Sequence, residues 1–490
     1  MFKLQLPVEL LRAIFEEYLR LDLPVQTLLE VNRQWHTVAL ETQSLWRRLL
    51  LSADAIPASL RAGSVHACAS EEQAACILKR SGTVTKLEVT FVLGPKEGET
   101  PTPEDRANLF KTVGHTTLHR ISFLCVIVNP EMTLSLMTAS LNNAFNGELP
   151  CLESLMIASA WSIGNLYDPL NVLMDIIERS SPNLESINLE NVSPNFVLRA
   201  FAKGLWPRLT RITIRKDFSS LGVTIFSRFR SLEFLYFVGG LTLPSPVHWA
   251  CSGSALNTQI DFPNLKWLYV GFIPMSTFVK LRMDRLHTMY IDLVGAAYPA
   301  SSPPPGTLCF PALKELHVAT IDPSLSCIYA PDLDMLCLAI PVLRPADADR
   351  VLKGVFNGSE RMMKPRFLAL RGPVHNKCLV VVLRSLPGLV SLELGSELLY
   401  SKTFWTKVTP PQGRSRAPLL PNLRYLVVDL HRSQVAQGEG LEMRVLLQKL
   451  IEGRRENDQY KNLLRLACKW REGAEFEEMV DPSNVSRVRQ

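Results

Sequence analysis

The sequence contains no apolar run near the roughly 18 residues that a membrane-spanning helix needs. Its apolar runs, such as Ile121–Val128 and Leu379–Leu383, have the length of a strand or a short helix. The first residues do not form a secretory signal, because Glu9 and Arg12 interrupt the apolar stretch. These absences predict a protein of the cytoplasm or the nucleus that has no membrane partner.

Short motifs of common catalytic and cofactor sites are absent as well. We find no glycine-rich phosphate loop, no dinucleotide-binding glycine pattern, no Gly-x-Ser-x-Gly motif and no Cys-x-x-Cys pair. The 10 cysteines are scattered among leucine-rich segments, which is typical of small buried side chains and not of disulfides. We therefore expect a protein that is not an enzyme and that holds no metal and no cofactor.

Charge of one sign is also scarce. The formal net charge is +6 over 490 residues, and acidic and basic residues are intermixed. Such a weak field does not indicate nucleic acid as a partner. The composition, 47% hydrophobic and 20% charged, predicts instead a folded protein with a large apolar core.

Residues 6–50 carry the spacing of three short helices. Apolar side chains recur three and four residues apart in the first, which places them on one helix face. A break at Asp22–Pro24 precedes a second short helix over Val25–Glu30, and a further helical stripe runs from Val31 to Ala39. The apolar residues of the first helix are Leu10, Leu11, Ile14, Phe15 and Tyr18.

This segment is too small to bury its large apolar side chains among themselves. Domains of about 45 residues usually need a disulfide, a metal ion or a partner, and residues 6–50 contain no cysteine. Either the segment binds another protein, or it caps the repetitive region that follows. The residue pattern alone leaves both interpretations open.

The same segment resembles an F-box. The family's opening Leu-Pro, its Glu-Leu-Leu and Ile-Phe, its Val-x-Arg-x-x-Trp-like element and its closing Leu-Trp have counterparts here in the same order. Asn32 departs from the pattern, since the family often has a small residue or cysteine at that position. The matching residues are Leu6, Pro7, Glu9, Leu10, Leu11, Ile14, Phe15, Val31, Arg33, Trp35, Leu45 and Trp46.

An F-box implies docking on the Skp adaptor of a cullin–RING ubiquitin ligase. The resemblance covers the first tenth of the chain, so the role of the remainder depends on its own residues. The adaptor-binding residues that the resemblance implies are Leu6, Pro7, Leu10, Leu11, Ile14, Phe15, Val31, Trp35, Leu45 and Trp46.

From Val84 onward, one pattern returns almost to the C-terminus, as in Leu184-x-x-Ile187-x-Leu189. Its last two apolar positions alternate as in a half-buried strand, and a proline two residues earlier, such as Pro182, ends the preceding segment without disturbing the strand. The copies lie roughly 20–34 residues apart, a spacing close to that of leucine-rich repeats. They begin at Val84, Leu118, Leu152, Leu184, Leu209, Leu232, Leu265, Leu286, Leu313, Leu333, Leu389 and Leu423, with a degenerate copy at Arg366–Leu370.

Helix signals lie between several copies. Asp168-Pro169 and Ser193-Pro194 indicate helix starts, and His375–Ser385 has helical spacing. Strand followed by helix, many times over, predicts a curved parallel solenoid with strands on the concave face and helices outside. This region resembles leucine-rich repeats, although the usual asparagine or cysteine after the strand is mostly missing. An ordinary α/β domain with leucine-rich strands is the alternative.

We therefore expect an α/β protein with a three-helix F-box and an irregular leucine-rich-repeat solenoid. The expected boundaries are 1–50 for the F-box, 51–80 for a helical linker, 81–440 for the solenoid and 441–490 for a cap and charged tail. Strand faces and rim loops of solenoids bind other proteins. The predicted target-binding residues are Trp249, Lys266, Trp267, Lys314 and Arg424.

Two functions fit this organisation. The chain is either the substrate-recognition subunit of a cullin–RING (SCF-type) ubiquitin ligase, with an unknown target protein on its repeats, or a non-enzymatic leucine-rich-repeat scaffold without ubiquitin transfer. An enzyme, the third class, would need a convergent pocket of titrating residues.

Overall fold

The computed structural model divides the chain into two compact units, Met1–Val238 and Gly239–Gln490. Each unit is described separately. The residues that the structure describes are 6–52, 65–68, 70–82, 86–93, 117–128, 148–159, 167–203, 206–215, 221–242, 259–291, 308–319, 325, 328–339, 349, 352–353, 355–356, 363–372, 376–395, 419–430, 449–450, 465–470 and 477–479. Most of the predicted C-terminal cap and charged tail, 441–490, lies outside these residues.

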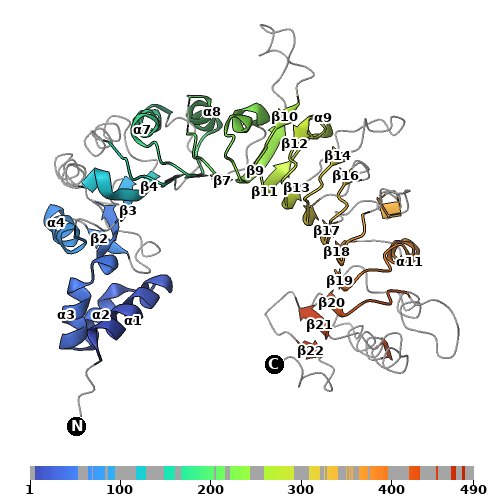
Figure 1. The fold of residues 1–490 in the computed structure, drawn as a ribbon, viewed down its shortest axis with the longest axis horizontal. Helices are drawn as coiled ribbons and strands as arrows, with labels where there is room; N and C mark the ends of the chain where they lie inside the picture. The colour runs from blue at the N-terminus through green and yellow to red at the C-terminus, as the bar shows by residue number, and fades with distance from the viewer. Residues whose placement is uncertain are drawn as a thin grey trace, which may run out of the picture. The chain divides into compact units, whose positions relative to one another are not determined.

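Three helices open the first unit, in agreement with the sequence (Figure 1). They are α1 (Val8–Arg20), α2 (Val25–Val31) and α3 (Arg33–Glu41), followed by the 3-10 turn η1 (Gln43–Trp46). Asp22, at the predicted break, has a left-handed φ of 54°. Asn32 caps α3, because its side chain accepts a hydrogen bond from the Trp35 backbone N–H at 3.0 Å. This cap gives a structural reason for the departure from the F-box pattern.

The helices and η1 enclose one apolar core. Phe15 and Trp35 meet edge to face, with ring centroids 5.5 Å apart, and Trp46 donates its indole N–H to the Ala39 carbonyl at 2.9 Å. The buried members of this core are Leu11, Phe15, Leu19, Val25, Leu28, Val38, Ala39, Leu45 and Trp46.

A parallel sheet follows the helices directly, because β1 (Arg48–Ser52) begins two residues after the last residue of η1. β1 pairs in parallel with two later strands. These are β2 (His66–Cys68) and β3 (Leu87–Leu93). From β3 onward, each strand pairs in parallel with the next long strand of the unit. These are β4 (Ile121–Val128), β5 (Ser154–Ser159), β6 (Ser186–Glu190), β7 (Arg211–Arg215) and β9 (Phe234–Thr242), and the end of β9 from Gly239 onward belongs to the second unit.

One repeat has a different phase from the prediction. The sequence pattern placed Leu118, Ile121 and Phe123 at the apolar positions, but the sheet aligns Leu124 with Leu155 of the next strand. An irregularity at the start of the β3–β4 pairing causes the shift. Phe123 consequently stays half-buried while Leu124 is fully buried.

Helices cover one side of this sheet in the first unit, where α7 and α8 lie on the same side of the strands (Figure 1). The unit contains α4 (Glu71–Arg80), η3 (Leu118–Arg120), α7 (Tyr167–Ser180), α8 (Pro194–Lys203), β8 (Leu221–Gly222) and η4 (Val223–Arg228). Ser193 caps α8 at the predicted start by accepting the Phe196 N–H at 3.2 Å. The region expected to be a helical linker contains the helix α4 and also the strand β2, which the sequence did not indicate.

The second unit repeats the parallel arrangement. Its long strands are β11 (Trp267–Phe272), β13 (Thr288–Ile291), β15 (Glu315–Val318), β17 (Met335–Ala339), β18 (Phe367–Arg371), β19 (Ser391–Leu394), β20 (Tyr425–Leu430) and β21 (Arg465–Trp470). Each pairs in parallel with the next, and β22 (Glu477–Met479) returns antiparallel to β21.

Short strands occur in some connections of this unit. Two of its helices have both ends within the described residues, α9 (Met275–Phe278) and α11 (Asn376–Arg384), the second where His375–Ser385 predicted one. Elsewhere, β10 (Ile260–Asp261) pairs with β12 (Leu281–Arg282), and β14 (Leu308–Cys309) pairs with β16 (Ile328–Tyr329). In the described connections of this unit, short strands therefore occur beside helices, which makes the repeats irregular.

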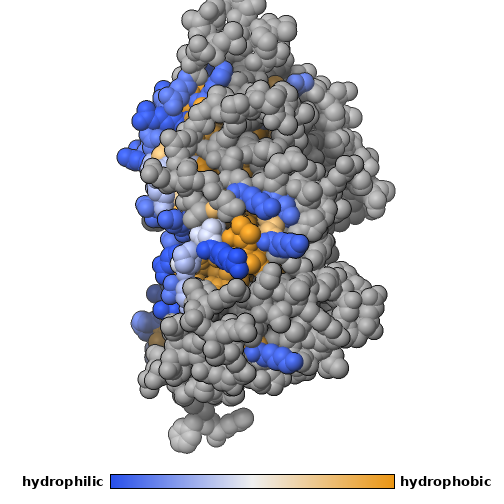
Figure 2. All heavy atoms as spheres, turned by 90° about the vertical axis from the view of Figure 1, so that its right-hand side faces the viewer, coloured by the Kyte–Doolittle hydropathy of each residue, from blue (hydrophilic) through white to orange (hydrophobic). Residues whose placement is uncertain are grey.

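Side chains alternate between two faces along these strands. Leu268, Leu316 and Leu336 are buried on the side of the connections. The residue that follows each of them along its strand is half-exposed on the opposite side of the sheet, which we call the open face. On the side shown in Figure 2, the coloured side chains at the surface are mostly hydrophilic, and hydrophobic side chains are visible between them, most of all near the middle of the view. Within the described residues, no helix has both the length and the apolar character to cross a membrane.

Candidate functional sites

Exposed apolar side chains concentrate in the first helices. Leu10 and Ile14 lie one turn apart on α1, with 53% and 39% of their surfaces exposed, and Val31 at the end of α2 is 51% exposed. Elsewhere among the described residues, the large hydrophobic side chains with comparable exposure are Leu198 and Tyr425. Such a concentration on a small helical segment makes it the candidate site for a partner. Its members are Val8, Leu10, Ile14, Leu21, Leu23 and Val31.

The residues that the F-box resemblance implied for adaptor binding fall into two groups. Leu11, Phe15, Leu45 and Trp46 are buried, at most 3% exposed, and hold the segment together. Pro7, Leu10, Ile14 and Val31 are exposed, and Leu6 and Trp35 are half-buried. Only the second group is accessible at the surface of this structure, whereas Trp46 is 3% exposed and packs inside the segment.

Trp46 instead connects the helical segment to the sheet. The His66 ring stacks on its indole, with centroids 4.5 Å apart, and the Arg80 guanidinium lies 4.7 Å from the same ring system. Arg48 adds a polar connection, since it contacts Asp22 at 2.7 Å and Glu88 at 2.8 Å. The segment is therefore packed against β1, β2 and α4 of its own unit.

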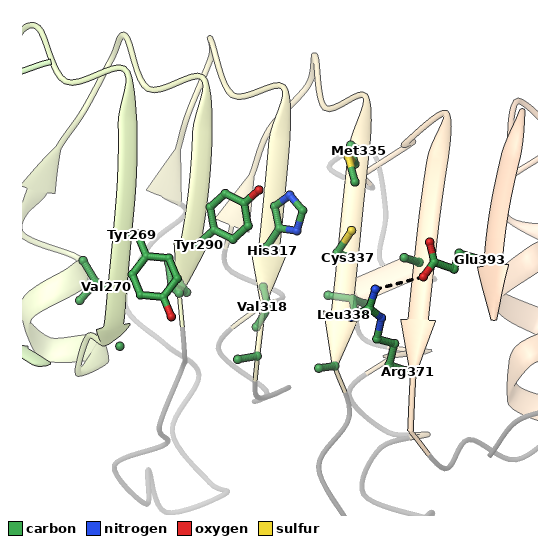
Figure 3. Close-up of a pocket in the computed structure, with 15 residues that line it drawn as sticks. Tyr269, Val270, Tyr290, His317, Val318, Met335, Cys337, Leu338, Arg371 and Glu393 are labelled. Carbon is green, nitrogen blue, oxygen red and sulfur yellow. Dashed lines mark hydrogen bonds and ion pairs between the residues drawn. The ribbon is translucent and has the colours of Figure 1, made fainter. Parts of the chain in front are cut away.

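A second candidate site is a hollow of about 480 Å³ on the open face of the second unit. Residues of β11, β13, β15, β17, β18 and β19 line it (Figure 3). The strand register places one residue of each strand in a single row across its middle. In order, that row is Tyr269, Tyr290, His317, Cys337, Ala369 and Glu393.

Titrating groups in the hollow are held in their neutral or paired forms. Burial lowers the pKa of His317, opposed by nearby Glu315, and its Nε2 is buried without a hydrogen-bond partner. Burial also raises the pKa of the Cys337 thiol to about 11, so that the thiol stays protonated near neutral pH. Arg371 donates to the Glu393 carboxylate at 3.0 Å. The hollow thus contains titrating residues, but not a thiolate beside an imidazolium.

Four of the predicted target-binding residues are described, and none of these four lines the hollow. Trp267 is half-buried at the start of β11, with its ring 5.6 Å from that of Tyr290. Lys266, Lys314 and Arg424 each precede a strand and therefore lie at the edge where strands begin. Trp249 lies outside the described residues.

Sequence reasoning missed the residues that form the hollow. The positions between the last two apolar residues of each copy carried the signal, because they face away from the core by alternation. From one copy to the next, these positions hold aromatic rings at first, then the small Cys337 and Ala369, and then Glu393. The members not anticipated are Tyr269, Tyr290, His317, Cys337, Arg371 and Glu393.

The strand-start edges differ in charge between the two units. In the first unit, backbone hydrogen bonds connect Ser122, Glu153, Glu185, Thr210 and Glu233 in one row. The corresponding row in the second unit is Lys266, His287, Lys314, Asp334, Arg366, Val390 and Arg424. The first row is acidic and the second is mainly basic. Each edge therefore presents a charge pattern that a partner surface can complement.

Comparison with protein-family models gives one finding. Residues 4–52 match the F-box-like model, which includes α1, α2, α3 and η1 and ends with β1. The comparison with curated proteins gives no match. Among the described residues, no group of three or more His, Cys, Asp or Glu side chains is placed to hold a metal ion.

Proposed function

We propose that the chain is the substrate-recognition subunit of a cullin–RING ubiquitin ligase of the SCF type. In this proposal residues 6–50 dock on a Skp-family adaptor, and the open face and strand-start edges bind a target protein. The concentration of exposed apolar side chains on the F-box-like segment supports it most directly. A surface of this kind is stabilised when a partner covers it.

The division of chemistry in such a ligase needs no catalytic residue in this chain. A receptor holds its target near the conjugating enzyme that carries ubiquitin, which raises the effective concentration of target lysines. The protonated Cys337 thiol and the paired Arg371 and Glu393 support a binding role for the hollow. We place the protein in the cytoplasm or nucleus, with proteins and not nucleic acid or membranes as its partners.

Capture of a purified Skp-family adaptor by the full chain tests the proposal. Leu10→Asp and Ile14→Asp place a charge in the exposed apolar surface and are expected to abolish capture. Both side chains are exposed, so the melting temperature should stay within the range of ordinary surface substitutions. Leu198→Asp is the matched control, because Leu198 is also an exposed leucine, 37%, but lies on α8.

Two results would contradict the receptor role. One is wild-type protein that captures no adaptor, which would favour the scaffold function. The other is Leu10→Asp protein that captures the adaptor as well as Leu198→Asp does, which would separate adaptor binding from the exposed surface of α1. Phe15→Ala is unsuitable as a test, since it empties a fully buried core position and is expected to destabilise the segment by about 3–5 kcal/mol.

A further inference from the structure

The aromatic side chains on the open face of the second unit form a stack with an open end. Tyr269 and Tyr290 lie with ring centroids 6.0 Å apart, and Tyr290 and His317 lie 3.9 Å apart at 10°. Tyr290 and His317 overlap face to face, whereas Tyr269 and Tyr290 are offset with their planes at 30°, so the rings follow the row from β11 to β15. One face of the imidazole covers Tyr290, and the other is directed toward β17, where no ring follows in the row.

Small side chains follow this open end. Cys337 and Ala369 are the next two residues of the row, and Ala339 lies beside them on β17. A planar guanidinium bounds the far side, since Arg371 is 54% exposed and pairs with the largely buried Glu393 carboxylate. Figure 3 shows Cys337 between the His317 ring and Arg371. The hollow is therefore a gap between a ring face and a guanidinium, above a floor of small residues.

We propose that this hollow receives one uncharged aromatic side chain from an extended segment of the target protein. The inserted ring continues the Tyr269–Tyr290–His317 stack over Cys337 and Ala369, and Arg371 covers its other side. Stacked rings and an arginine over a ring are both favourable arrangements. Tyr, Trp and Arg are also the residues that dominate binding energy at protein interfaces.

The charges around the hollow favour an uncharged occupant. The Arg371 guanidinium is already paired with Glu393 at 3.0 Å, and Glu315 accepts a hydrogen bond from the Thr288 hydroxyl at 3.4 Å. An acidic or basic side chain would have to displace these partners or lose its hydration without gaining a new one. An aliphatic side chain fills the floor but leaves the imidazole face and the guanidinium without a stacking partner.

This inference rests on the proposed role of the sheet in target binding. Capped glycine–serine peptides with one central Trp, Leu, Lys or Glu are titrated against the purified full chain. The Trp peptide is expected to bind tightest. Ala369→Phe fills the hollow and should weaken Trp-peptide binding by about tenfold or more. Thr213→Phe is the matched control, because Thr213 occupies the same row position on β7 in the first unit.

A second variant tests the far wall without filling the hollow. Arg371→Lys keeps the charge beside Glu393 but removes the planar group, and should weaken Trp-peptide binding severalfold while Leu-peptide binding stays unchanged. Equal or tighter binding of the Leu, Lys or Glu peptide would overturn the inference, as would unchanged Trp-peptide binding by Arg371→Lys. Adaptor capture is measured on the same samples. If the wild-type protein captures the adaptor but does not prefer the Trp peptide, only the proposed aromatic-binding role of the hollow is rejected. If the wild-type protein captures no adaptor, the receptor role is rejected.

Discussion

The imidazole of His66 lies flat on the indole of Trp46, with ring centroids 4.5 Å apart. His66 Nε2 is also 2.7 Å from the Leu45 carbonyl oxygen, so the neutral ring donates its Nε2 proton there. His66 belongs to β2, and Trp46 ends the helical segment at η1. One histidine therefore contacts the last two apolar residues of the F-box-like segment at its junction with the sheet.

This contact makes the junction sensitive to acid. Burial lowers the pKa of His66. The hydrogen bond to the Leu45 carbonyl raises this pKa in part, and the nearby Arg80 charge lowers it again. In the unfolded chain the ring takes up a proton near its ordinary pKa of about 6.5, whereas the folded protein resists protonation to lower pH. The stability that the neutral His66 ring contributes to the folded state is therefore complete above pH about 6.5. It is lost as the pH falls below that value toward the lower pKa of the folded protein. We expect faster amide hydrogen exchange in residues 43–52 at pH 5.5 than at pH 7.5, after correction for intrinsic rates. His66→Phe keeps the stack and should remove most of that pH dependence; an unchanged dependence would assign it to another group.

The Asn32 cap predicts a defined loss of stability. Replacing Asn32 with Ala removes the acceptor of the Trp35 backbone N–H and should destabilise the segment by about 1 kcal/mol. Asn32→Ser or Asn32→Asp should restore most of it, because both side chains can accept the same bond. Urea denaturation measures the difference. If Ala is tolerated as well as Ser, the cap is dispensable in this protein.

Local patterns were enough to predict the helices of the first unit but not the surface of the second. The three- and four-residue spacing of Leu11 and Phe15 determines which side of α1 is buried, and that information is local. The hollow instead depends on which residues of different strands become neighbours. Cys337 beside His317 creates a gap only because the sheet aligns them. The shifted phase of β4 shows the same dependence, since one irregularity in pairing moved Phe123 out of the core face.

Gly240 has a neighbour that explains its lack of a side chain. A Cβ at this position would overlap the ring of Phe272. Gly240→Ala is therefore expected to destabilise the second unit by about 1–3 kcal/mol, through displacement of that ring. Phe272→Leu makes room, so the double variant should be more stable than the sum of the single effects indicates. Urea unfolding of the four proteins gives the coupling free energy. A coupling near zero would show that the ring moves aside without cost.

Cys337 distinguishes a binding hollow from a catalytic one. An enzyme that used this cysteine with His317 would need a thiolate near neutral pH. Burial, and next the Glu393 carboxylate, raise the pKa of the Cys337 thiol to about 11 against a smaller opposing effect of Arg371. We therefore expect iodoacetamide to alkylate Cys337 much more slowly at pH 7.5 than Cys309, which is exposed in the same unit. Peptide mass spectrometry over a time course measures both rates in one sample. Faster alkylation of Cys337 than of Cys309 would mean that the hollow activates its thiol, and would argue for chemistry at this site instead of side-chain recognition.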